Sequence, residues 1–194
     1  MAIYVTSDAH GHVRALDEAL SKISLASDDT LYVLGDMIDR GPDPLGVIKL
    51  VRSLPNAHVL KGNHEQIMLD AIIGQDPLDA ETWDINGGWT TREQLNDMEF
   101  EAYEELVRWM ATLPLYAVVE TEERPYLLVH AGIQTEAARA FLLEHGVDCA
   151  DGAGAVGADR ELLQQMLAVQ SSDDLLWIRH GYWDAPTGLL SAEG

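Results

Sequence analysis

Three short apolar runs in the first half of the chain each end in a polar segment that contains glycine. The runs cover residues 2–7, 30–34 and 57–60, and their β-branched and apolar residues are typical of buried strands. Two stretches with helical periodicity, residues 13–23 and 44–54, separate them. Alternating strands and helices predict an α/β fold, with a parallel sheet, right-handed crossovers and helices that cover the sheet.

A polar segment follows each of these strands, and a fourth follows a later strand. The segments read D-A-H-G from residue 8, G-D-M-I-D-R-G from residue 35, G-N-H-E from residue 62 and H-A-G from residue 130. Asp36 follows Asp8 by 28 residues and Asn63 follows Asp36 by 27 residues, about one strand–helix unit each. Because the carboxyl ends of the strands in an open α/β sheet face one crevice, we expect these segments to form one site.

The side chains in these segments suit a metal centre. Carboxylates, imidazoles and an amide oxygen, with no thiolate among them, favour manganese, iron or zinc over copper or an iron–sulfur cluster. A central carboxylate can bridge two ions about 3.5–4 Å apart, as two-metal hydrolases require. The segments therefore predict a centre for two divalent metal ions.

Each of these residues alone also has a structural explanation. Asp8 or Asp36 could cap the helix that follows it, and Asn63 could be a turn residue. His130 could form a structural hydrogen bond at the end of its strand. Four such segments, in order and on matching elements, favour one shared metal site over four separate structural roles.

The remainder of the chain predicts a single domain over residues 1–194. Residues 75–112 are acidic, carry three tryptophans and are interpreted as a helical and loop insert at the rim of the cleft. We expect this insert to be packed, with a mobile lid as the alternative. Two strands at residues 115–120 and 126–130 and a helical region over 134–170 follow.

Composition restricts the partners of the chain. The net charge of −21 argues against non-specific binding of nucleic acid, although a metal centre and a few arginines can still attract a phosphorylated substrate. Residues 1–5 lack the basic region of a signal peptide, and no apolar run reaches the roughly 20 residues that span a bilayer. We therefore expect a cytoplasmic protein with no membrane contact, and the oligomeric state stays open. Cys149, the only cysteine, lies in a Gly/Ala-rich stretch and is expected to be inert.

The four polar segments together resemble those of the calcineurin-like metallophosphoesterases. More narrowly, they are similar to the phosphoprotein phosphatase branch, which includes the bacterial and phage serine/threonine protein phosphatases. The resemblance covers nearly the whole chain, through Trp177-Ile178-Arg179. It implies a layered α/β fold with central sheets flanked by helices, and two divalent metal ions with manganese preferred over iron or zinc.

The resemblance also implies a role for each residue that matches a motif. The implied metal ligands are Asp8, His10, Asp36, Asn63 and His130, with Asp36 bridging the two ions. His64 would protonate the leaving group and Asp39 would orient it, while a hydroxide that bridges the metals attacks phosphorus in line. The implied substrate-binding residues are Arg40, Arg179 and Asn63, the arginines because guanidinium groups bind phosphoryl oxygens bidentately.

One expected ligand is missing from the sequence. The family carries a histidine in a Gly-His motif near the C-terminus, and no such motif occurs here; His180 follows Arg179 but matches the arginine segment instead. We expect the last C-terminal strands of the fold to be lacking and the second metal site to be one ligand short. A shortened chain and a natural short form both explain this.

Three functions are consistent with the sequence. The first is a metal-dependent phosphomonoesterase, a protein serine/threonine phosphatase acting on a phosphorylated protein or a small phosphoester. The second is a symmetrical dinucleoside-tetraphosphate hydrolase. The resemblance implies that an acid immediately before Arg-Gly belongs to the protein phosphatases and not to the tetraphosphatases, so Asp39 before Arg40-Gly41 favours the first function. The third is a non-catalytic phosphate- or metal-binding module with an incomplete second metal site. The presence of His64, Asp39, Arg40 and Arg179 argues against the third, since a binding module needs no proton donor.

Overall fold

The computed structural model describes residues 1–74, 76–122, 124–147 and 159–179 of the chain. The chain packs as two compact units, Met1–Pro114 and Leu115–Gly194, and each has a hydrophobic core of its own. Cys149, the segment 151–158 and His180 lie outside the described residues. A single metallophosphoesterase domain over residues 1–194 stays a prediction.

A parallel sheet forms the centre of the first unit. Its strands lie in the order β1 (Ile3–Thr6), β2 (Thr30–Val33) and β3 (Ala57–Val59). Leu31 of β2 pairs with Tyr4 on one side and with Ala57 on the other, and both pairings are parallel. The three predicted strands and the α/β fold with a parallel sheet are thus confirmed.

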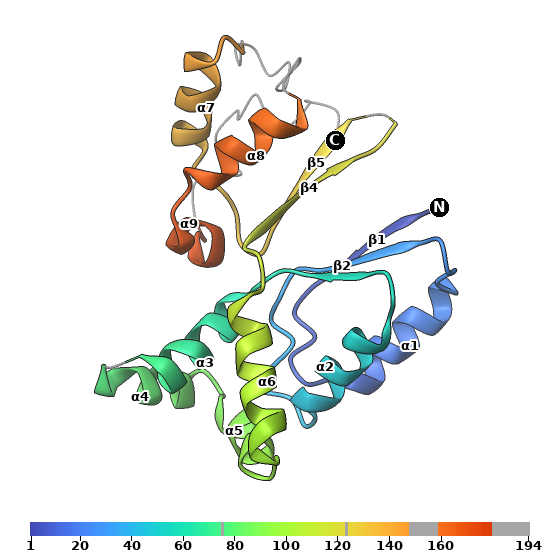
Figure 1. Cartoon of the computed structure of the whole chain (residues 1–194), viewed down its shortest axis with the longest axis vertical. Helices are drawn as coiled ribbons and strands as arrows, with labels where there is room; N and C mark the ends of the chain where they lie inside the picture. Colours follow the sequence, from blue (N-terminus) through green and yellow to red (C-terminus); the bar gives the residue numbers. More distant parts are fainter. Residues whose placement is uncertain (75, 123, 148–158, 180–194) are drawn as a thin grey trace. The chain divides into compact units, whose positions relative to one another are not determined.

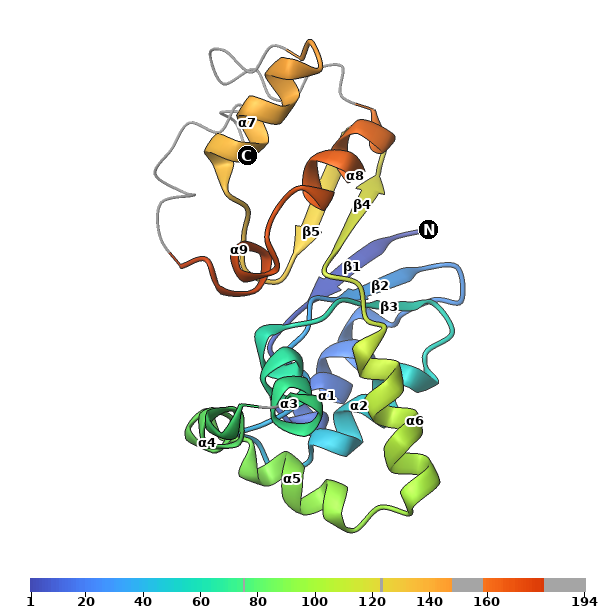
Figure 2. The same ribbon diagram turned by 60° about the vertical axis from the view of Figure 1, so that its left-hand side comes forward.

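Six helices accompany this sheet. They are α1 (Val13–Ile23), α2 (Pro44–Ser53), α3 (Asn63–Ile73), α4 (Pro77–Ile85), α5 (Trp89–Asn96) and α6 (Phe100–Ala111). Figures 1 and 2 show α1, α2, α3 and α6 on one side of the sheet. The core lies between the sheet and these helices, with Leu31, Val33 and Val47 among its fully buried side chains.

Local sequence signals explain where helices begin. The Asp43 carboxylate accepts a hydrogen bond from the backbone N–H of Gly46 at 2.9 Å and caps α2, whose first residue is Pro44. α4 begins in the same way, with an aspartate cap followed by proline. Residues 86–88 separate α4 from α5. Trp83 before the break is buried, whereas Trp89 after it is 52% exposed.

The second unit joins an antiparallel strand pair to three helices. Its elements are β4 (Tyr116–Glu120), β5 (Pro125–Val129), α7 (Thr135–Glu144), α8 (Arg160–Ala168) and α9 (Ser172–Trp177). Val118 of β4 is buried against Leu142 of α7 and Leu163 of α8. Figure 2 shows α8 lying across the two strands. The two strands predicted in this region are confirmed.

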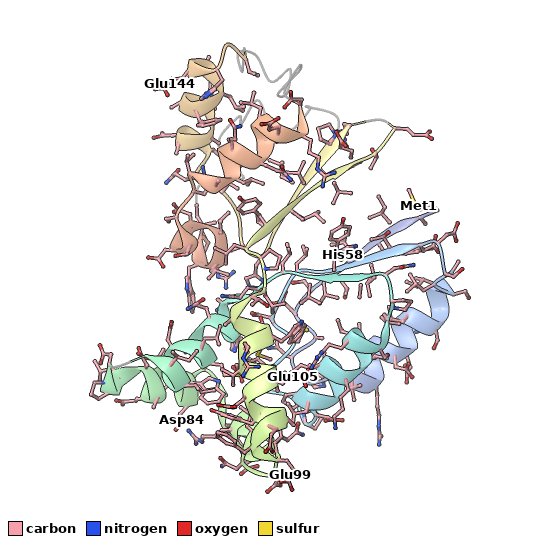
Figure 3. The ribbon with its side chains drawn as sticks, in the orientation of Figure 1. Met1, His58, Asp84, Glu99, Glu105 and Glu144 are labelled. Atoms are coloured by element: carbon pink, nitrogen blue, oxygen red, sulfur yellow. The ribbon has the colours of Figure 1, made fainter. Side chains whose placement is uncertain are left out.

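The acidic excess lies largely on the surface. Exposed acidic residues labelled in Figure 3 include Asp84 of α4, Glu99 at the start of α6 and Glu144 at the end of α7. Among the described residues, no helix combines the length and the apolar character needed to cross a bilayer.

Candidate active site

The polar segments that follow β1 and β2 lie side by side in the first unit. The backbone N–H of Asp8 donates to the Gly35 carbonyl at 3.2 Å, and that of His10 donates to the Asp36 carbonyl at 2.9 Å. The backbone N–H of His64, in the first turn of α3, donates to Asp36 Oδ1 at 3.0 Å. The ends of three parallel strands thus deliver these side chains to one place.

Two glycines permit this close approach. Gly35 has a φ of +88°, and a Cβ there would lie 2.2 Å from the backbone nitrogen of Gly62. A Cβ on Gly62 would lie 2.2 Å from Asp36 Oδ1. Any larger residue at either position would therefore push the second segment away from the third.

Backbone strain is concentrated in the first two segments. Six described residues other than glycine have a positive φ, and one of them, Ser24, ends α1. The other five are Asp8, His10, Asp36, Asp39 and Arg40. A positive φ costs a non-glycine residue about 1–2 kcal/mol, so the surrounding contacts must hold these residues in place. Such clusters are typical of functional sites.

His10 is held in the tautomer that a metal ligand needs. Its Nδ1 donates to the Ile38 carbonyl at 2.8 Å, which leaves the lone pair on Nε2. Nε2 lies 3.5 Å from Asp36 Oδ2 and 3.8 Å from Asp8 Oδ1. Burial lowers the pKa of His10, an effect that the Ile38 carbonyl and the Asp36 charge partly oppose. The neutral imidazole is therefore favoured, with Nε2 directed at two carboxylates.

His64 and Asp39 form a buried pair. Nδ1 of His64 lies 2.7 Å from Asp39 Oδ2, and neither side chain is exposed. On the other side of the ring, Nε2 accepts a hydrogen bond from Arg40 Nη2 at 2.7 Å, so the network assigns the proton to Nδ1. Arg40 Nη1 lies 3.0 Å from His10 Nε2. The guanidinium group thus contacts the imidazoles of both His10 and His64.

Glu65 is a structural member of the site that the sequence analysis did not assign. Its buried carboxylate accepts hydrogen bonds from the backbone N–H groups of Asp36, Met37 and Gly62, each at 2.8 Å. Burial, together with the charge of Asp36, raises the pKa of Glu65. Its place in G-N-H-E, next to the predicted acid, was the one signal that could have drawn attention to it.

Trp83 and Thr91 also contact the site, and the sequence analysis assigned them no function. Trp83 Nε1 donates to Asp39 Oδ1 at 3.1 Å and to Oδ2 at 3.2 Å, and Thr91 Oγ1 donates to Oδ1 at 2.6 Å. These residues follow Asp39 by 44 and 52 positions. No local pattern marks them, because their proximity depends on how α4 and α5 pack.

His130 and Arg179, the remaining predicted site residues, belong to the second unit. His130 follows β5 and is partly buried, and Arg179 follows α9 and is exposed. The backbone N–H of Ala131 donates to the Leu175 carbonyl at 2.9 Å, which joins the segment after β5 to α9. Their participation in the site stays a prediction, as do the roles assigned to the residues of the first unit.

The order of these segments along the chain matches a known family. The sequence model of the calcineurin-like phosphoesterases matches residues 1–187, which include every predicted site residue. The chain belongs to the calcineurin-like phosphoesterase family. The predicted family is thus confirmed, and members of this family use divalent metal ions.

Two curated relatives of this calcineurin-like phosphoesterase are symmetrical bis(5'-nucleosyl)-tetraphosphatases. The protein from Proteus mirabilis is 34% identical over 138 residues, covering 69% of this chain and 45% of its own length. The protein from Erwinia tasmaniensis is 32% identical over 136 residues, with the same coverage of 69% and 45%. The chain therefore spans less than half the length of these relatives.

A solved structure shares the fold. A protein serine/threonine phosphatase from Saccharomyces cerevisiae superimposes with a TM-score of 0.50 at 18% identity, over 98% of this chain and 51% of the phosphatase. At this identity the likeness concerns the fold alone.

The donor set of the first unit fits a divalent metal ion. Among the predicted ligands, His10 Nε2 lies 3.5 Å from Asp36 Oδ2 and 3.8 Å from Asp8 Oδ1, so the three atoms are close enough together to bind one ion. Imidazole nitrogen and carboxylate oxygen are ligands that manganese, iron and zinc accept. The backbone contact that orients His10 is of the kind that commonly supports a metal ligand.

Proposed function

We propose that this calcineurin-like phosphoesterase is a metal-dependent phosphomonoesterase that acts on phosphoserine or phosphothreonine in proteins. The observation that carries the proposal is the buried hydrogen bond between His64 Nδ1 and Asp39 Oδ2. Because the Nδ1 proton is held by Asp39, Nε2 is the nitrogen that is left to take up a proton and deliver it to the leaving group. A site that only bound phosphate would need no such pair.

The chemistry of the leaving group favours a monoester of an alcohol. A serine or threonine alkoxide is a strong base, so its departure requires a proton, and a positioned acid contributes about 10²–10⁴-fold. The leaving group from a phosphoanhydride is a weak base that departs without one. The His64–Asp39 pair therefore has most to contribute when the substrate is an alkyl phosphate.

The metal ions would be held by the carboxylates, imidazoles and amide of the four segments. The proposed ligands are Asp8, His10, Asp36, Asn63 and His130. When bound, two divalent cations, with manganese preferred, supply Lewis-acid activation of water and neutralise charge on the phosphoryl group. Asp36 is suited to lie between the two because it contacts both the first and the third segment.

Arginine side chains would bind the phosphoryl oxygens. The Arg40 guanidinium lies beside both His10 and His64, where it can orient a substrate phosphoryl group towards the proton donor. We propose the same function for Arg179 and a contact from Asn63. In-line transfer spreads charge over the equatorial oxygens, and planar guanidinium groups match that distribution.

Hydrolysis of dinucleoside tetraphosphates in a symmetrical manner is the second candidate. The likeness to the relatives from Proteus mirabilis and Erwinia tasmaniensis favours it. Both candidates use the same metal centre and differ in the leaving group.

The test compares substrates on metal-stripped protein supplied with manganese. Turnover of a phosphoserine peptide faster than that of diadenosine tetraphosphate, and its loss in Asp36→Asn, would support the proposal. The reverse preference, with the same dependence on Asp36, would establish the second candidate. A folded protein that binds manganese and hydrolyses neither substrate would instead support the non-catalytic binding module.

A further inference from the structure

The Asp39 carboxylate has three side-chain hydrogen-bond donors. His64 Nδ1 contacts Oδ2 at 2.7 Å, Thr91 Oγ1 contacts Oδ1 at 2.6 Å, and Trp83 Nε1 contacts both oxygens at 3.1 and 3.2 Å. All four side chains belong to buried residues. Two of the donors thus come from α4 and α5, far along the chain from the segments that carry the predicted chemistry.

Trp83 and Thr91 are neutral donors, and this affects the charge that Asp39 presents to His64. A buried carboxylate is costly to desolvate unless hydrogen bonds satisfy it. An arginine or lysine at this place would satisfy the anion but would also compete with His64 for its charge. An indole N–H and a hydroxyl are neutral, so they hold the carboxylate in place while its negative charge remains directed at His64.

α5 and the turn before it also support the backbone at residues 39 and 40. Asp39 and Arg40 have φ values of +68° and +66°. The Asp39 N–H donates to Thr91 Oγ1 at 2.9 Å, and the Arg40 N–H donates to the Gly87 carbonyl at 3.1 Å. Thr91 therefore accepts from the backbone of Asp39 and donates to its side chain, which defines both the position and the direction of the carboxylate.

The glycines between α4 and α5 make this arrangement possible. Gly87 has a φ of +92°, and a Cβ there would lie 2.9 Å from Arg40 Cγ. A Cβ on Gly88 would lie 2.2 Å from Trp83 Cδ1. The tight turn thus lets the last part of α4 and the first part of α5 face the same carboxylate.

We propose that Trp83 and Thr91 are positioning residues that act on the reaction only through Asp39 and His64. This inference rests on the proposed function, in which His64 protonates the leaving group. It extends the site to two buried side chains of α4 and α5. The competing explanation is that both residues only contribute to packing. Positioning predicts a larger loss of activity on substrates with a poor leaving group, whereas a packing role predicts equal losses on all substrates.

The variants remove hydrogen bonds and keep volume. Trp83→Phe removes the N–H and keeps an aromatic ring, and Thr91→Val replaces the hydroxyl by a methyl group. Thr91→Ser keeps the hydroxyl and serves as the rescue variant. Trp109→Phe, at a partly buried tryptophan that contacts Arg52, is the matched control for the change of ring.

The first readout is the dependence of kcat on the leaving group. We expect Trp83→Phe to lower kcat about tenfold on an alkyl phosphate, the effect of losing one hydrogen-bond donor, and about twofold or less on p-nitrophenyl phosphate. Thr91→Val should lower kcat on the alkyl phosphate at least as much, because it removes both the bond to the Asp39 carboxylate and the bond from the Asp39 N–H. Thr91→Ser and Trp109→Phe should stay close to the wild type on both substrates. Combined with His64→Asn, neither Trp83→Phe nor Thr91→Val should cause a further loss, because residues that act as a unit are non-additive.

The second readout needs neither turnover nor metal. The hydrogen-bonded Nδ1 proton of His64 should give a downfield proton resonance that His64→Asn removes, and Trp83→Phe and Thr91→Val should shift it. Equal losses on both substrates, losses that add to that of His64→Asn, or an unshifted resonance would overturn the inference. If His64→Asn itself fails to distinguish the two substrates, the proposed function fails; if it distinguishes them and Trp83→Phe does not, only the positioning fails.

Discussion

The Glu65 carboxylate accepts a hydrogen bond from the backbone N–H of Asp36 at 2.8 Å, across 29 residues of sequence. Through further bonds to the N–H groups of Met37 and Gly62, it joins the segment after β2 to the first turn of α3. Asp36 and His64 therefore keep their relative position because of a side chain that itself has no place in the proposed reaction.

Glu65→Gln should destabilise the fold by about 1–3 kcal/mol, the cost of leaving a buried hydrogen-bond donor unsatisfied. Whichever way the glutamine amide is turned, its NH₂ group faces at least one backbone N–H that now lacks an acceptor. Urea unfolding followed by circular dichroism measures the change. Glu99→Gln, at an exposed position, should change the free energy of unfolding by less than about 0.5 kcal/mol. A Glu65→Gln protein as stable as that control would contradict the interpretation.

Asp36→Asn should abolish hydrolysis and weaken manganese binding while leaving the fold intact. The asparagine carbonyl can still accept the hydrogen bond from the His64 N–H, so stability should change little, but the charge that metal ions require is lost. Calorimetric titration with manganese and thermal unfolding separate the two effects. Asp97→Asn, at an exposed position, should bind manganese as the wild type does. Near-normal turnover by Asp36→Asn would remove this residue from the metal centre.

His64→Asn should reduce the hydrolysis of alkyl phosphates about 10²–10⁴-fold, the usual contribution of a positioned acid. Aryl phosphates should be affected less, because p-nitrophenolate departs without a proton. Steady-state kinetics on a pair of substrates that differ only in the leaving group give the ratio. Equal losses on both would exclude His64 as the proton donor.

Asp29 should make stability depend on pH. Its carboxylate accepts hydrogen bonds from the N–H groups of Ala2 at 2.6 Å and Ala26 at 3.0 Å, and these bonds lower the pKa of Asp29. A lowered pKa means that the stabilisation is fully present above about pH 3.9, where a free aspartate is ionised, and is lost as the pH falls through the lower value of the folded state. The wild type should thus unfold at a higher temperature than Asp29→Asn at neutral pH, and the difference should shrink in acid. A difference that is constant down to pH 2 would contradict this.

Much of the architecture was predictable because it follows from local patterns. Apolar runs ending in glycine and polar residues marked β1, β2 and β3, and helical periodicity marked α1 and α2. The family could be recognised for the same reason, since its motifs are short and contiguous. The spacing of Asp8, Asp36 and Asn63 indicated one strand end per motif, and parallel pairing makes such ends neighbours.

The tertiary structure decided which residues surround the predicted acid and its carboxylate. Trp83 and Thr91 could not be assigned from sequence, because a tryptophan in a helix and a threonine in the next are far more often packing residues than hydrogen-bond donors to one carboxylate. Their contacts with Asp39 depend on the turn at Gly87, on the packing of α4 against α3 and on the packing of α5 against α2. Periodicity and motif spacing predict which segments form helices and strands, and at which end of a strand a polar side chain lies. Hydrogen bonds between side chains 44 and 52 residues apart exist only once the helices have packed, and leave no pattern along the chain.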